Sequence, residues 1–95
     1  MAEIKANSQR AAALLKSMSN ESRLLILCHL GTQELSVGEL NERIALSQSS
    51  LSQHLAKLRQ EGLVETRRES QTIYYRIATP VALKVIEILH KECCQ

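Results

Sequence analysis

The chain has 95 residues, three of them cysteines, and a formal net charge of +2 from 12 Lys and Arg against 10 acidic residues. This length predicts a single domain over residues 1–95, and so small a charge excess does not by itself indicate a nucleic-acid partner. Every acid is a glutamate, which excludes triads with an Asp orienter, EF-hand loops and Walker-type magnesium sites. No apolar run suits a signal peptide or a membrane span, so we expect a cytoplasmic protein with reduced thiols and no membrane partner.

Apolar periodicity predicts two helices in the first third of the chain. One stripe of the first, amphipathic helix carries Ile4, Ala11, Leu15 and Met18. Ser19 and Asn20 break this helix and offer an N-cap for the next one. The second helix, roughly residues 21–30, is apolar almost all round, so we expect it in the middle of the core, with Gly31 ending it.

Two further capped helices follow, separated by a short turn. Ser36 and Glu39 have the spacing of a capping box and open a short third helix. Its inward side is predicted to carry Val37, Leu40 and Ile44. Ser47 caps a fourth helix that runs to about Gln60, and Gly62 stops it. The inward face of this fourth helix carries Leu51, Leu55 and Leu58.

The pattern then alternates, which predicts two short strands over residues 63–68 and 72–78, joined at residues 69–71. Thr79 and Pro80 are typical of a helix start, and the last helix is expected from Val81 to about Cys94. More than half of its circumference is apolar, so one face is left to meet a second partner. The order of elements predicts a mainly α fold with a β-hairpin wing, namely a winged helix-turn-helix with an extra helix at each end.

The fourth helix has an outer face suited to DNA. Opposite the leucines lie Ser49, Gln53 and Gln60, flanked by Ser50 and Lys57. Serine and glutamine donate to and accept from base edges and phosphates, and no acid occurs over residues 43–60. Arg67 and Arg68 near the hairpin end are placed to reach the DNA backbone or a narrow minor groove. A merely solvated helix face and a charged strand edge are the alternatives, but their combination in this order of elements favours DNA binding.

Residues 34–40 (ELSVGEL) followed by residues 46–55 (LSQSSLSQHL) resemble the ArsR/SmtB family of bacterial transcriptional regulators. The resemblance covers nearly the whole chain. It implies a homodimer formed by the first and last helices and double-stranded operator DNA as the partner. It also implies that Gln48, Ser49, Ser52 and Gln53 contact DNA, and Ser49 and Gln53 agree with the polar face described above.

The resemblance also bears on the signal. Ser36 and Gly38 stand where the arsenic, lead and cadmium sensors of the family carry cysteines, and the Asp-x-His pattern of its zinc sensors is absent. Cys28 and a cysteine near the chain end are similar to the redox- and persulfide-responsive branch, with Cys94 aligning best and Cys93 as an additional thiol. This likeness implies that oxidation or persulfidation links Cys28 to Cys94, with oxidants or reactive sulfur species as the signal and no metal or cofactor.

Other interpretations stay open. Cys28 within an apolar helix is also typical of a small core residue. A metal-responsive, zinc-type repressor would use Cys28, His29, His90, Cys93 or Cys94, although neighbours at 28 and 29 do not share a helix face. A winged helix used only for protein contacts would bind no DNA. An enzyme is disfavoured because the chain has no Cys-x-x-Cys motif and no Asp, and is short for a substrate pocket.

Overall fold

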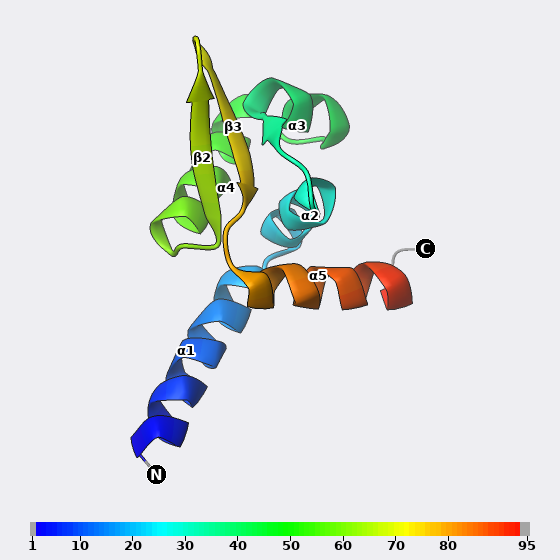
Figure 1. The fold of residues 1–95 in the computed structure, drawn as a ribbon. Coiled ribbons are helices and arrows are strands. Elements are labelled where there is room, and N and C mark those ends of the chain that lie inside the picture. The colour runs from blue at the N-terminus through cyan, green and yellow to red at the C-terminus, as the bar shows by residue number, and fades with distance from the viewer. Residues whose placement is uncertain (1, 94–95) are drawn as a thin grey trace.

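A computed structural model describes residues 2–93, with side chains described for residues 7–92. Within this range the chain forms five helices and a three-stranded sheet (Figure 1). The elements are α1 Ala2–Met18, α2 Glu21–Leu30, β1 Leu35–Ser36, α3 Val37–Arg43, α4 Gln48–Gln60, β2 Val64–Glu69, β3 Thr72–Ile77 and α5 Pro80–Cys93. None of the helices in this part of the chain is long and apolar enough to cross a membrane.

The helix starts are fixed by side chains three residues apart, as predicted. In the capping box of α3, the Glu39 N–H donates to Ser36 Oγ at 3.1 Å and the Ser36 N–H donates to Glu39 Oε1 at 3.0 Å. At the start of α4, Ser47 Oγ accepts from the Ser50 N–H at 3.1 Å. The remaining two caps are Asn20, which accepts from Arg23 N at 3.0 Å, and Thr79, which accepts from Ala82 N at 3.3 Å. Each contact satisfies a backbone donor that the helix itself leaves unpaired.

The core lies where α2, α3, α4 and the first turns of α5 meet the sheet. The three leucines predicted for the inner face of α4 are at most 1% exposed: Leu51, Leu55 and Leu58. Ile26, Leu27 and Leu30 of α2 are fully buried, but Leu25 is 43% exposed. The prediction that α2 is enclosed on all sides is therefore wrong on one side, because the elements packed around it leave Leu25 uncovered.

The helix α1 extends away from the body of the molecule, as Figure 1 shows. Among the other elements, its main packing partner is α2. Met18, at its C-terminal end, is buried at 4% exposure, whereas Leu15 is 54% exposed. Most of the predicted apolar stripe of α1 therefore meets nothing within one chain, and the side chain of Ile4 lies outside those described.

The sheet has the order β1-β3-β2, and both pairings are antiparallel. Glu69 pairs with Thr72, so a two-residue loop joins the hairpin strands, and Ser70 adopts a positive φ of 58° there. The hairpin was predicted within one residue at each outer end. The third strand, β1, was not predicted, because two residues are too short to carry an alternating pattern.

The helix α5 has a buried side and an exposed apolar side. Ala82 and Ile86 are at most 2% exposed and join the core. Val81 and Ile88 are 58% and 62% exposed, which confirms the apolar surplus expected of this helix. The described part of α5 ends at Cys93, and Cys94, the predicted last residue, lies outside the described residues.

Candidate DNA-binding interface

The N-terminal half of α4 presents the polar side chains predicted to contact DNA. They are all exposed: Gln48, Ser49, Ser52 and Gln53. The opposite side of the helix is anchored by buried leucines, which fixes the rotation of α4 about its axis. The first turn of α4 carries no acid, so the positive end of the helix dipole is not neutralised from within the helix. Such a helix end is suited to a phosphate oxygen, and the side chains beyond it are suited to base edges.

The turn between α3 and α4 is held by an amide that the sequence did not reveal. Asn41 Nδ2 donates to the backbone oxygen of Leu46 at 2.9 Å. Ile44 is buried and Leu46 packs against the core from the same turn. These contacts fix α4 relative to α3, as a helix that enters the major groove requires. An Asn at this point could have been noticed as a turn residue, but its acceptor could not have been named.

Lys57 lies farther along α4 and has an acidic neighbour. Its Nζ is 3.2 Å from Glu61 Oε1, an i, i+4 pair that leaves the Lys57 side chain 52% exposed. Hydrogen bonding from Ser17 and from Lys57 lowers the pKa of Glu61, so this carboxylate is charged at neutral pH. The acid-free stretch thus ends at the residue that follows α4, and the charge of Lys57 is partly compensated there.

Arg67, on the wing, is bound to its own chain. Its Nε lies 3.1 and 3.2 Å from the two carboxylate oxygens of Glu34, and Nη2 lies 3.0 Å from Oε1 of the same residue. Nη1 donates to Glu69 at 3.0 Å, and the guanidinium stacks over Tyr74 at 4.9 Å from the ring centre. Hydrogen bonding to Arg67 lowers the pKa of Glu34, and the same contact raises the pKa of Arg67. The predicted role of Arg67 at DNA stays a prediction, but most of its donors already hold the wing to the segment before β1.

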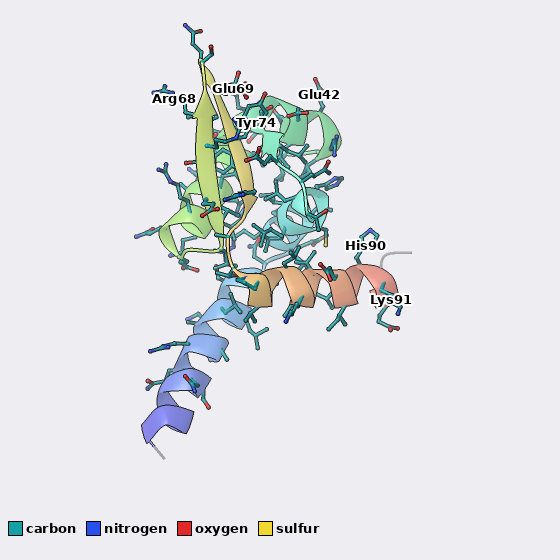
Figure 2. The ribbon with its side chains drawn as sticks, viewed as in Figure 1. Glu42, Arg68, Glu69, Tyr74, His90 and Lys91 are labelled. Carbon is teal, nitrogen blue, oxygen red and sulfur yellow. The ribbon has the colours of Figure 1, made fainter. Side chains whose placement is uncertain are left out.

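Arg68, the next residue of β2, is exposed. Figure 2 shows it close to the hairpin tip, extending away from the strands, while Tyr74 lies between the hairpin and α3. The two neighbouring arginines therefore differ in accessibility, although the sequence treats them alike.

The cysteines are only partly within the described residues. Cys28 is half-buried on α2 and packs against the core. Helix α2 contacts α5, the helix that leads to the chain end. Cys93 is the last residue of α5 but its side chain is not described, and Cys94 lies outside the described residues. Within that range, no three His, Cys or Glu side chains gather as a metal site would require, and the Ser36 hydroxyl serves as a helix cap.

The fold and the exposed polar face of α4 define a winged helix-turn-helix regulator. A family model described as "Bacterial regulatory protein, arsR family" matches residues 20–66. The transcriptional activator HlyU of Vibrio cholerae is 55% identical over 93 residues, which cover 98% of this chain and 86% of HlyU. The chain therefore belongs to the ArsR family and is a transcriptional regulator. Its relatives are regulators and not enzymes.

Solved structures agree with this assignment over the whole fold. The structure of reduced HlyU from Vibrio cholerae N16961 matches with a TM-score of 0.93 at 54% identity and covers 100% of both chains. The crystal structure of the transcriptional repressor BigR from Xylella fastidiosa matches with a TM-score of 0.87 at 38% identity, covering 98% of this chain and 95% of BigR. The prediction of a winged helix-turn-helix fold in the ArsR/SmtB family is confirmed.

Proposed function

We propose that this regulator binds double-stranded operator DNA as a homodimer and that the state of its thiols controls the affinity. The observation that carries DNA binding is the exposed, acid-free outer face of α4. Gln48, Ser49, Ser52 and Gln53 would reach base edges and nearby phosphates in the major groove. Lys57 and the wing arginines at 67 and 68 would add contacts to the DNA backbone.

The homodimer is supported by apolar side chains that one chain leaves exposed on α1, α2 and α5: Leu15, Leu25, Val81 and Ile88. Exposed apolar side chains at this density usually mark a contact surface. A second copy that covered α1 and α5 would place two α4 helices for successive major grooves, about 34 Å apart. The substitution Ile88→Glu should convert the dimer to a monomer in analytical ultracentrifugation. Thr32→Glu, which adds the same charge at an exposed site outside α1 and α5, should leave the dimer intact.

DNA binding is tested by selection from a random duplex pool, followed by fluorescence anisotropy on the selected duplex. We expect Gln53→Ala to weaken binding by about tenfold, because a good side-chain contact to a base contributes about 1–3 kcal/mol. The matched control is Gln33→Ala, an exposed glutamine outside α4 and the hairpin. Absence of salt-dependent binding to any duplex would contradict the proposal and favour a protein-contact module.

The proposed signal is oxidation or persulfidation of Cys28 and Cys94. In the disulfide form, the two thiols lose two protons and two electrons to an oxidant; a persulfide donor would instead insert additional sulfur between them. Support comes from the packing of α2, which carries Cys28, against α5, which leads toward Cys94. One solved relative is itself described as reduced HlyU. Because α5 would also form the dimer contact, a bond to α2 would change the spacing of the two α4 helices and weaken binding.

The signal is tested by measuring DNA affinity in dithiothreitol and after treatment with a persulfide donor. Affinity should fall after treatment, and Cys28→Ser should remove the response. Intact mass spectrometry should show a Cys28–Cys94 bridge, and Cys93→Ser should still respond. Equal affinity in both states, or a full response in Cys28→Ser, would overturn thiol control. Release of DNA by stoichiometric zinc would favour a metal-responsive repressor instead.

A further inference from the structure

A cavity of about 760 Å³ lies between α1, α2 and the C-terminal end of α4, away from the polar residues at the start of α4. Four basic side chains line it, against one carboxylate, that of Glu61. The basic residues are Arg10, Lys16, Arg23 and Lys57. Ala13, Leu14 and Leu63 supply apolar walls. The cavity thus combines an excess of positive charge with apolar surface, a combination typical of sites for small organic anions.

Two polar atoms of the cavity lining are buried without a hydrogen-bond partner. They are the Oγ of Ser17, a residue only 3% exposed, and the Nε of Arg23. A buried donor without an acceptor is destabilising, and native proteins satisfy nearly all such groups. Both groups can donate to the same kind of acceptor, a carboxylate or phosphate oxygen.

Glu61 does not supply that acceptor. Ser17 lies close enough to lower the pKa of Glu61, and the charge of Arg23 acts in the same direction. Even so, neither Ser17 Oγ nor Arg23 Nε reaches hydrogen-bonding geometry with any group. The Glu61 carboxylate is instead paired with Lys57 at 3.2 Å. Donors therefore converge on the space beside Glu61.

The cavity does not coincide with the exposed apolar stripe of α1. At about 100° per residue, Arg10 and Ser17 fall on one side of the helix, and Ala11 and Leu15 fall roughly 130° away. A partner chain that covers Ala11 and Leu15 would therefore leave the Arg10 and Ser17 side facing the cavity. The cavity and the proposed dimer contact use different sides of α1.

We infer that this cavity binds a small organic anion. Its carboxylate or phosphate oxygens would accept from Ser17 Oγ and Arg23 Nε, and its apolar part would lie against Leu14 and Leu63. Binding at the cavity does not depend on the proposed function. Its effect on DNA does rest on that function, because Lys57 lines the cavity and is also a predicted DNA-contacting residue. An anion that attracts Lys57 would lower DNA affinity.

The site is tested on the reduced full chain without DNA, by heteronuclear NMR. Sodium benzoate, phenyl phosphate and inorganic phosphate are titrated in turn against sodium chloride at equal ionic strength. We expect saturable shifts of the amides around Ser17, Arg23 and Glu61 with at least one aromatic anion, and none with chloride. Benzoate and phenyl phosphate separate the two oxyanion chemistries. Shifts that follow only ionic strength would overturn the proposal.

Two variants and a control make the test specific. Ser17→Ala and Arg23→Gln should each weaken anion binding by about tenfold, because each removes one donor. Arg59→Gln, which removes an exposed arginine elsewhere on α4, should bind as the unmodified chain does. Thermal unfolding monitors the fold of Arg23→Gln, and Ser17→Ala deletes an unpartnered hydroxyl and should fold normally. Unchanged binding in Ser17→Ala, or in a folded Arg23→Gln, would overturn the site.

The effect on DNA is measured separately, as DNA affinity in the bound anion against equal sodium chloride. A loss of affinity that Ser17→Ala abolishes supports the link through Lys57. Retained NMR binding with unchanged DNA affinity would overturn the link while supporting the site. Failure to bind any duplex, with intact anion binding, would instead count against the proposed function.

Discussion

The two surfaces expected to meet DNA, the start of α4 and the wing, handle their polar groups in opposite ways. On α4, the exposed side chains at 48, 49, 52 and 53 are small or flexible and carry no charge. On the wing, Arg67 is engaged by Glu34, Glu69 and the ring of Tyr74. The first surface is open to a partner, whereas much of the second is used to hold its own shape.

This difference teaches how recognition and positioning are divided in the molecule. Uncharged hydrogen-bonding groups discriminate between bases, while arginine contacts to phosphate are independent of sequence. Arg68 is the wing arginine that extends away from its strand, so we expect it to contact phosphate, and Arg67 to keep the hairpin in place. Substitutions in the two regions should therefore have distinguishable effects.

The largest effect is expected from an acid on the open surface. Gln53→Glu places a negative charge beside DNA phosphates and removes a donor, so affinity should fall by about a hundredfold. Anisotropy with the selected duplex measures this loss. Gln33→Glu adds the same charge outside α4 and the hairpin and is the control. A loss below about threefold for Gln53→Glu would mean that α4 does not face DNA.

A smaller and less selective effect is expected from the exposed wing arginine. Arg68→Ala should weaken binding to specific and random duplexes alike, because it removes a positive charge from beside a phosphate. The slope of log affinity against log salt should decrease by about 0.9 for each phosphate that the protein no longer neutralises. Affinity measured over a salt series provides this slope. An altered preference among duplexes would indicate that Arg68 reads bases.

Arg67→Ala should act mainly on the wing itself. With the links to Glu34 and Glu69 removed, the amides of β2 and β3 near the hairpin tip should exchange faster with deuterium. The loss of DNA affinity should be smaller than for Arg68→Ala, with little change in salt slope. Glu34→Gln should reproduce the faster exchange because it weakens the same contact. A salt slope reduced as much as in Arg68→Ala would show that Arg67 contacts phosphate after all.

The smallest expected effect is on the pH dependence of the wing. The pKa of Glu34 in the folded chain is lowered from 4.5, chiefly by the hydrogen bond from Arg67. A lowered folded pKa means that this contribution is complete above 4.5 and is lost as the pH falls through the folded pKa. The tip amides should therefore lose protection in acid, below pH 4.5. Glu34→Gln should lack this part of the acid dependence, while other acid-induced changes persist.

Much of the fold could be predicted because its determinants are close together in the sequence. The Ser36–Glu39 capping box and the cap at Ser47 act over three residues, and the leucine spacing of α4 repeats within two turns. These patterns predicted both the order of elements and which side of α4 is exposed. They were therefore sufficient to propose Ser49 and Gln53 as contact residues before the fold was known.

The features that escaped prediction depend on residues far apart in the chain. Glu34 and Arg67 are 33 positions apart, and no local pattern pairs them. Strand β1 exists only because Leu35 lies opposite Tyr75. The cavity beside Ser17 and Arg23 forms where two helices meet the end of a third. Such contacts are consequences of tertiary packing, and periodicity contains no trace of them.

Ser36 has a consequence beyond its role as a cap. It is the last residue of β1, paired with Tyr74, and the N-cap of α3, so the sheet continues into the helix-turn-helix without an intervening loop. Such a junction provides no hinge, and the wing and α4 should tilt together as one lever. A signal acting at α5 would then change DNA affinity by moving each lever relative to its counterpart in a second chain.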